Sequence, residues 1–249
     1  MNNQIKQKIG VLIQARMGST RLPYKVLLNL DENEKVLDLL IERLKLSKLI
    51  DEIIIATTPD KKNSLIVDVA KVHNVSYFIG SEENVLKRYY KASKKFKLNI
   101  IIRATADNPF LDPRILDEII AFFKKNEYDY IKTLNLPIGL NVEIFSFETL
   151  KKVYNLAKSK PDKEHVTYFI YTHPDFFKIY YYIFENFKNI ENLRLTIDEK
   201  DDLIMCREIY KRLKEKGKEL DFSTYDIVEI IEKNPELINI NKHVNQKAV

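Results

Sequence analysis

The 249-residue sequence contains one cysteine, no tryptophan and only five glycines. The lone Cys206 excludes an internal disulfide and a cysteine-based metal site, so we expect it to be a core residue. No stretch approaches the ~18 consecutive apolar residues of a membrane helix. The apolar run after residues 1–8 is interrupted by Gln14 and Arg16, which is not the pattern of a secretory signal. We therefore expect a cytoplasmic protein without a membrane segment.

Charge of one sign is not concentrated anywhere in the chain. The 41 basic and 36 acidic residues give a net charge of +5 and lack the basic stripe with interleaved aromatic residues that nucleic-acid grooves use. We therefore expect no nucleic-acid partner. Hydrophobic residues at 45% and charged residues at 31% are typical of a globular protein. The length suits one domain over residues 1–249.

The first half of the chain alternates between strand and helix patterns. Short β-branched runs predict strands at 9–13, 52–56, 75–79 and 99–103, and helical spacing predicts helices at 36–49, 65–73, 85–96 and 115–125. This alternation indicates an α/β fold, Rossmann-like, with a mostly parallel sheet flanked by helices on both faces. Ligands bind such sheets beyond the carboxyl ends of the strands. The polar segments 14–25, 57–58, 80–81 and 103–107 should therefore share one edge.

The second half is less regular. Short strands at 129–131 and 142–145 predict a mixed sheet, and helices are expected at 202–216 and, after the possible caps Ser223 and Thr224, at 224–234. The aromatic segment 176–184 predicts one long strand with two apolar faces, in which Tyr180, Tyr181 and Tyr182 pack rather than stack on a ligand. Such a strand must be covered, within the fold or by a second copy. We expect a dimerisation extension and a homodimer.

The loop after the first predicted strand concentrates groups that bind phosphate. Residues 14–27 contain Gly18, the hydroxyls of Ser19 and Thr20, and three cations at Arg16, Arg21 and Lys25. A glycine lets backbone N–H groups approach an anion, so the set predicts a polyphosphate cradle. It matches neither the P-loop nor the Gly-x-Gly-x-x-Gly dinucleotide turn. The alternative is a surface loop with accidental charges.

The string from Ile13 to Leu27 resembles the opening signature of the cytidylyltransferase family that includes the spore-coat polysaccharide protein SpsF and the CMP-Kdo and CMP-sialic acid synthetases. One departure is Tyr24, where the family usually has glycine. Further segments resemble later family blocks, so the resemblance spans about residues 8–215; these segments are 80–89, 103–113, 139–146, 164–167 and 193–198.

The resemblance implies a fold of the nucleotide-diphospho-sugar transferase type. Its nucleotide-binding half would span about 8–125, its acceptor-binding and dimerisation half about 126–220, and its C-terminal helices about 202–234. It also implies a Mg²⁺-dependent reaction in which a sugar or sugar acid attacks the α-phosphorus of CTP and expels pyrophosphate, for surface polysaccharide or glycan biosynthesis. Cations on the β- and γ-phosphates and carboxylates on the metal suit that chemistry.

By the resemblance, the catalytic residues are Arg16, Arg21, Lys25 and Asp107. Asp107 and Asp198 would bind Mg²⁺, which accepts one or two carboxylates together with phosphate oxygens and water. Two alternatives stay open: Asp107 as a helix cap before Pro109, and Asp198 as a cap of the helix near Asp202.

The resemblance also assigns two binding sets. The nucleotide-binding residues are Gln14, Ala15, Arg16, Gly18, Ser19, Arg21, Lys25, Thr57, Thr58, Gly80, Ser81, Arg88 and Arg103. The acceptor-binding residues are Asn141, Glu143, Glu164, His165 and Arg194. Many relatives have aspartate at position 141, which leaves the acceptor open. Arg88 could instead pair with an acid on its own helix. His165 is either a general base or a wall residue, and we expect the other three histidines to be structural or on the surface.

Two rival functions remain at this stage. Some chains with this signature resemble guanylyltransferases that act on a sugar 1-phosphate, and no residue decides between cytosine and guanine. The second rival is a catalytically silent homologue that binds a nucleotide as a partner subunit. Against it stands the presence together of Arg16, Arg21, Lys25, Asp107 and Asp198, which a silent relative has no chemical reason to keep.

Overall fold

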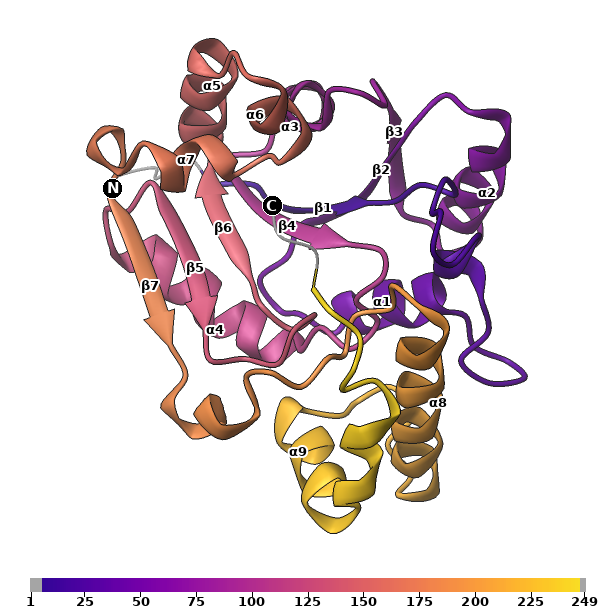
Figure 1. Ribbon diagram of the computed structural model, residues 1–249. Coiled ribbons are helices and arrows are strands. Elements are labelled where there is room, and N and C mark those ends of the chain that lie inside the picture. The colour runs from indigo at the N-terminus through magenta and orange to yellow at the C-terminus, as the bar shows by residue number, and fades with distance from the viewer. Residues whose placement is uncertain (1–5, 247–249) are drawn as a thin grey trace.

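The computed structural model describes residues 6–246 and is built on one seven-stranded sheet (Figure 1). The strand order is β3-β2-β1-β4-β6-β5-β7. β1 to β4 run parallel, β6 runs antiparallel to both β4 and β5, and β7 runs parallel to β5. The predicted α/β class with a mixed second half is confirmed. The strands are β1 Ile9–Gln14, β2 Glu52–Thr57, β3 Ser76–Ile79, β4 Ile100–Thr105, β5 Tyr130–Leu134, β6 Glu143–Ser146 and β7 Ile179–Ile183.

Helices cover both faces of the sheet. In Figure 1, α3, α5, α6 and α7 gather on one side, and α1, α4, α8 and α9 lie on the other. The α-helices are α1 Val36–Leu44, α2 Ser64–Val72, α3 Val85–Phe96, α4 Pro113–Lys125, α5 Phe147–Leu156, α6 Lys160–Glu164, α7 Tyr168–Thr172, α8 Lys200–Glu215 and α9 Thr224–Lys233. The 3₁₀ helices are η1 Lys25–Leu27, η2 Lys61–Asn63, η3 Pro174–Phe176, η4 Glu185–Ile190 and η5 Pro235–Ile240.

The sheet separates two hydrophobic clusters, as the period-2 geometry of a strand requires. On β1, Val11 and Ile13 point into the cluster that also contains side chains of α1, α4, α8 and α9, whereas Leu12 points into the cluster with α3 and α5. All three side chains are fully buried. A strand buried on both faces reads as a continuous apolar run, which is why β1 was predictable.

A buried arginine ties the C-terminal helices to the rest of the fold. The Arg43 guanidinium donates to the carbonyls of Leu111, Leu220 and Phe222 at 3.2, 2.6 and 3.0 Å. It also lies 3.4 Å from the centroid of the Phe222 ring. Burial lowers its pKa to about 9. α1 and the α8–α9 connection are therefore joined through backbone carbonyls rather than through an ion pair.

The aromatic strand is shorter than predicted. β7 covers only Ile179–Ile183, because Phe176 ends the 3₁₀ helix that begins at Pro174 and its N–H donates to the carbonyl of His173. Cys206 is fully buried, as expected. Within residues 6–246, no helix is both long and apolar enough to cross a membrane.

Candidate active site

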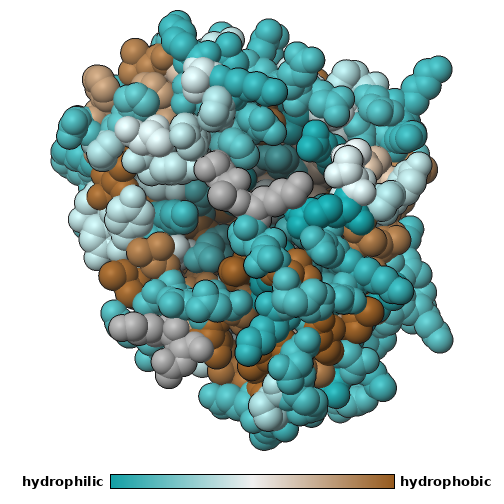
Figure 2. Space-filling model, viewed as in Figure 1, coloured by the Kyte–Doolittle hydropathy of each residue, from teal (hydrophilic) through white to brown (hydrophobic). Residues whose placement is uncertain are grey.

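Three adjoining cavities follow the carboxyl ends of β1 and β4. The largest has a volume of about 940 Å³ and shares Gln14 and Arg16 with a second cavity of about 270 Å³. It shares Arg103 and His165 with a third cavity of about 260 Å³. The shared residues make the three cavities one elongated cleft. Most of the face shown in Figure 2 is hydrophilic, and its hydrophobic side chains gather toward the left edge and the lower half.

The loop after β1 lines the second cavity. Arg16, Gly18, Ser19 and Lys25 all border it, together with Asp107 and Asp198. Nothing lies within 4 Å of a Cβ built on Gly18, so the backbone there is open to a ligand. The structure thus brings two of the predicted phosphate-binding cations, Arg16 and Lys25, and both predicted metal carboxylates to one cavity, and Arg21 pairs with Asp198 without lining it.

Tyr24 occupies a backbone conformation that favours glycine. Its φ of 59° and ψ of 16° lie in the left-handed region, immediately before the 3₁₀ helix η1 that carries Lys25. A residue with a Cβ pays roughly 1–2 kcal/mol in this region, which glycine does not. The glycine that the family signature usually has at this position is therefore explained by the backbone turn that aims Lys25.

A residue that the sequence analysis missed fixes this loop. Asn63, which is 3% exposed at the end of η2, accepts a hydrogen bond from the N–H of Met17 at 2.9 Å. Its amide in turn donates to the Thr58 hydroxyl at 2.6 Å. Asn63 therefore holds the segment after β2 and the loop after β1 together. Its position in sequence gave no signal, because it lies 46 residues from the loop that it holds.

Lys25 joins the two carboxylates. Its Nζ is 2.5 Å from Asp107 Oδ2 and 2.9 Å from Asp198 Oδ1. Burial alone would lower the pKa of Lys25, but the charges of Asp107 and Asp198 and their hydrogen bonds raise it. Burial alone would raise the pKa of Asp198, but Lys25, Arg21 and Arg194 lower it. Lys25 and Asp198 are therefore both charged at neutral pH.

Neither aspartate serves as a helix cap. The N-cap of α4 is Asp112, whose side chain accepts from the N–H of Arg114, and the N-cap of α8 is Glu199, which forms a capping box with Asp202. The capping alternatives for Asp107 and Asp198 are therefore wrong.

Backbone hydrogen bonds place the two carboxylates side by side. The N–H of Ile197 donates to the carbonyl of Asp107 at 2.9 Å, and the N–H of Leu195 donates to the carbonyl of Ile138 at 2.7 Å. Close packing at Gly139 permits this approach, since a Cβ there would lie 2.7 Å from the backbone nitrogen of Thr196. The segment before α8 is thereby held against the end of β4.

The paired carboxylates suit a hard divalent cation. Mg²⁺ typically takes one or two carboxylates and completes its octahedron with water and phosphate oxygens. Across residues 6–246, no group of three or more acidic, histidine or cysteine side chains forms a metal site. Asp107 and Asp198 could therefore hold a divalent cation together with phosphate oxygens and water.

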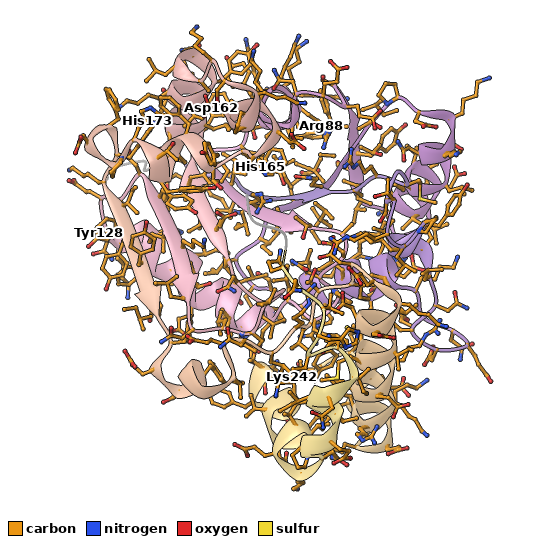
Figure 3. The ribbon with its side chains drawn as sticks, in the orientation of Figure 1. Arg88, Tyr128, Asp162, His165, His173 and Lys242 are labelled. Carbon is orange, nitrogen blue, oxygen red and sulfur yellow. The ribbon has the colours of Figure 1, made fainter. Side chains whose placement is uncertain are left out.

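The largest cavity is lined by arginines and lysines together with the glutamates Glu82, Glu83 and Glu164. Arg88 is 1% exposed and donates to the carbonyl of Ser81 at 2.6 Å rather than to an acid on α3, and its Nε has no hydrogen-bond partner among the described residues. Lys160 and Lys163 of α6, neither of them predicted, add two cations to the same lining. Figure 3 shows Arg88 on α3 and His165 after α6 near the upper rim of the sheet.

The third cavity contains the predicted acceptor residues Asn141, Glu143 and His165. Glu143 accepts from Arg103 at 2.5 Å and from Thr167 at 2.9 Å, and also from the hydroxyl of Tyr130. Burial would raise the pKa of Glu143, but the Arg103 charge and these hydrogen bonds lower it. Lys132 of β5 lines the cavity as well and was not predicted, because it is an isolated lysine on a short strand.

Some of the predicted nucleotide-binding and acceptor-binding residues do not line the cleft. Ala15 is buried and donates its N–H to the carbonyl of Ala56 at 3.2 Å. Thr57 and Thr58 are buried, Thr58 is bonded to Asn63, and neither threonine borders the two larger cavities of the cleft. Arg194 is bonded to Asp198 and Asp202 and is not part of the acceptor cavity. Gly80, Ser81 and Glu164 lie at or beside the largest cavity.

A cation-rich loop after β1, paired carboxylates and a polar cleft at the carboxyl ends of β1 and β4 are the arrangement of a nucleotidyltransferase. The chain belongs to the cytidylyltransferase family, whose profile matches residues 10–223. The resemblance inferred from the sequence is confirmed.

Known proteins agree with this assignment. The chain is 40% identical over 241 residues to an uncharacterized protein of Methanocaldococcus jannaschii, with 97% of each chain covered. It is 35% identical over 234 residues to the spore coat polysaccharide biosynthesis protein SpsF of Bacillus subtilis, with 90% of this chain and 94% of SpsF covered. A solved cytidylyltransferase from Leptospira borgpetersenii superposes with a TM-score of 0.87 at 32% identity, covering 98% of this chain and all of the other.

Proposed function

We propose that the protein transfers a cytidylyl group from CTP to a hydroxyl of a sugar or sugar acid, with release of pyrophosphate. The observation that carries this proposal is that Asp107, Asp198 and Lys25 line the second cavity together with Arg16, which also borders the largest cavity, where there is space for a base. Bound Mg²⁺ would neutralise charge on the phosphates and polarise the α-phosphorus. Asp107 and Asp198 would hold it.

The chain's own residues would orient the triphosphate. Arg16, Arg21 and Lys25 provide cations for the β- and γ-phosphates, where negative charge develops as pyrophosphate leaves. The N–H groups around Gly18 can approach the phosphate oxygens, because this part of the loop is open. Arg88 and Arg103 lie further along the largest cavity, within reach of ribose or base.

The acceptor would bind beside Asn141. Lys132 and Arg103 give this cavity a cationic lining against the single carboxylate of Glu143, which is already paired with Arg103. An acceptor with its own negative charge fits that lining. His165 borders both the nucleotide cavity and the acceptor cavity, the position that a base for the attacking hydroxyl would need.

We further propose a cytoplasmic role in surface polysaccharide or glycan biosynthesis. The similar Bacillus subtilis protein is a spore coat polysaccharide biosynthesis protein, which supports this assignment. A cytoplasmic site is where CTP is available.

Thermal unfolding with Mg²⁺ and each of CTP, GTP, UTP and ATP tests the donor. A ligand present at 100 times its dissociation constant adds about 2.7 kcal/mol to the stability of the folded state. We expect the largest shift of Tm with CTP. A larger shift with GTP would redirect the function to guanylyl transfer on a sugar 1-phosphate.

Replacing the first metal carboxylate tests the chemistry. Asp107→Asn should lower the rate of pyrophosphate release by at least ~100-fold while Tm changes little, because the amide cannot supply the anionic oxygen that a hard cation needs. The assay would use CTP, Mg²⁺ and a panel of sugar acids. Asp68→Asn, whose carboxylate is exposed and contacts only Lys71, is the matched control. Unchanged turnover in Asp107→Asn would remove Asp107 from the site.

A further inference from the structure

The position of Lys25 implies that this cation and a divalent metal compete for the same oxygens. Its ammonium contacts one oxygen of Asp107 at 2.5 Å and one of Asp198 at 2.9 Å, and the side chain is only 12% exposed. A metal bound by those two oxygens would occupy the same space and would be repelled by the ammonium. The two cations therefore exclude one another.

Asp198 is surrounded by further positive charge. Arg21 lies 3.1 Å from the same oxygen that contacts Lys25, and Arg194 lies 3.3 Å from the other oxygen. Arg194 is 4% exposed and fixed by the fully buried Asp202. Arg21 is also paired with Glu199, which is 42% exposed. Arg194 is therefore a fixed part of the site. Lys25 and Arg21 belong to the proposed phosphate-binding loop, where the phosphates of a nucleotide could replace the aspartate as their partner.

We propose that Lys25 is a cation latch: without nucleotide its ammonium fills the metal position and excludes free divalent metal, and an arriving triphosphate draws it away and frees both carboxylates. This inference rests on the proposed function, which assigns Asp107 and Asp198 to the metal. It goes further, because it gives Lys25 a second role before chemistry begins.

The side chain and its surroundings suit such an exchange. Lysine is a point charge on a flexible four-carbon stem, without the fixed fork that holds arginine to one partner. Lys25 borders the same cavity as Arg16, Gly18 and Ser19, where the phosphates would lie. A triphosphate therefore offers the ammonium a new set of oxygens within the reach of its stem. Because coupling between ligands is reciprocal, nucleotide and metal would bind as a pair.

Binding of Mn²⁺ to the nucleotide-free protein, followed by the electron paramagnetic resonance signal of free Mn²⁺, tests the latch without measuring turnover. We expect weak binding to the wild type and about 10- to 100-fold tighter binding to Lys25→Met, the range that one charge-assisted hydrogen bond spans. Lys25→Arg keeps a cation between the carboxylates and should stay weak. Circular dichroism and Tm establish that each variant is folded.

Arg16→Met is the matched control. It removes one positive charge from the same cavity, but Arg16 contacts Glu82 and neither aspartate. Its affinity for Mn²⁺ should change by less than about threefold, since an exposed charge in the loop is screened. An equal gain in Arg16→Met and Lys25→Met would assign the effect to net charge and overturn the latch.

The remaining outcomes separate the latch from the proposed function. If Lys25→Met binds free Mn²⁺ no tighter than the wild type, yet CTP promotes Mn²⁺ binding in the wild type and not in Asp107→Asn, the latch is wrong and the metal site stands. If no form of the protein binds Mn²⁺ with or without CTP, both are wrong.

Discussion

At the scale of one residue, the fold places the Glu34 carboxyl group where its ionised form is disfavoured. Its Oε1 is buried without a hydrogen-bond partner among the described residues. Burial, followed by repulsion from Asp38 and Asp31, raises its pKa to about 7. The folded state therefore binds a proton more readily than the unfolded state, where glutamate has a pKa of about 4.3. The stability of the fold falls as the pH rises between these two values.

We predict that Glu34→Gln stabilises the protein at pH 8 by an amount on the order of 1 kcal/mol and has much less effect near pH 4.5, because glutamine carries no charge at either pH. Urea denaturation at the two pH values measures the difference. Glu32→Gln, on the exposed side of the same turn, provides the control. A gain of equal size at both pH values would show that ionisation of Glu34 is not its cause.

At the scale of elements, the short helix η2 matters more than its three residues suggest. Asn63 at its end accepts from the backbone of Met17 and donates to Thr58, so it joins the loops that follow β1 and β2, the first of which we propose to bind the phosphates. A loop that is held in place loses less conformational freedom when it binds a ligand.

We predict that Asn63→Leu raises the KM for CTP several-fold and lowers stability by about 1–3 kcal/mol, because the Met17 N–H and Thr58 hydroxyl lose their buried partner. Asn63→Asp keeps the acceptor for Met17 and should show a smaller rise in KM. A separate measurement of kcat distinguishes positioning from chemistry. A fall in kcat at unchanged KM would contradict the positioning role.

The helices predicted from the sequence each show a repeated apolar pattern. α3 was predicted at residues 85–96 and observed there, because its apolar face is periodic and Asn84 accepts from the N–H of Lys87 as an N-cap. α5, α6 and α7 were missed. α6 and α7 are five residues each, and such short helices depend on caps such as Ser159 and on packing rather than on a repeated pattern.

The residues of the candidate site divide in the same way, into those with a signal in the sequence and those without one. Its loop cations and both aspartates were predicted because they lie in contiguous motifs that resemble the family signature, in the loop after β1 and in the segments 103–113 and 193–198. Asn63, Lys132 and Lys160 were not, because they come from separate elements that only the tertiary structure brings to the cleft. Spacing along the chain contains no such information.

At the scale of the whole molecule, the sheet ends in a strand whose second edge has no partner within residues 6–246. β7 pairs only with β5 there. On one face, Tyr180 and Tyr182 pack against Phe122 of α4. On the other face, Tyr181 and Ile183 are 45% and 51% exposed. Edge strands with apolar side chains favour pairing with a second chain.

We predict a homodimer through β7, formed across a two-fold axis so that the same strand of each copy meets. Light scattering at micromolar concentration should give twice the mass of the chain for the wild type and the monomer mass for Tyr181→Lys/Ile183→Lys. Val72→Lys alters an equally apolar side chain, 81% exposed on α2, and should leave the mass unchanged. A dimer that survives the β7 substitutions would place the interface elsewhere.

The segment before α8 contains no helix or strand, yet it should behave dynamically as part of the sheet. Leu195 and Ile197 are fully buried, and their N–H groups donate to the carbonyls of Ile138 and Asp107. Amide protons exchange with solvent only when such bonds open. In deuterated water these two amides should therefore exchange as slowly as those of β1 and β4. The backbone next to Asp198 would then open only when the core unfolds.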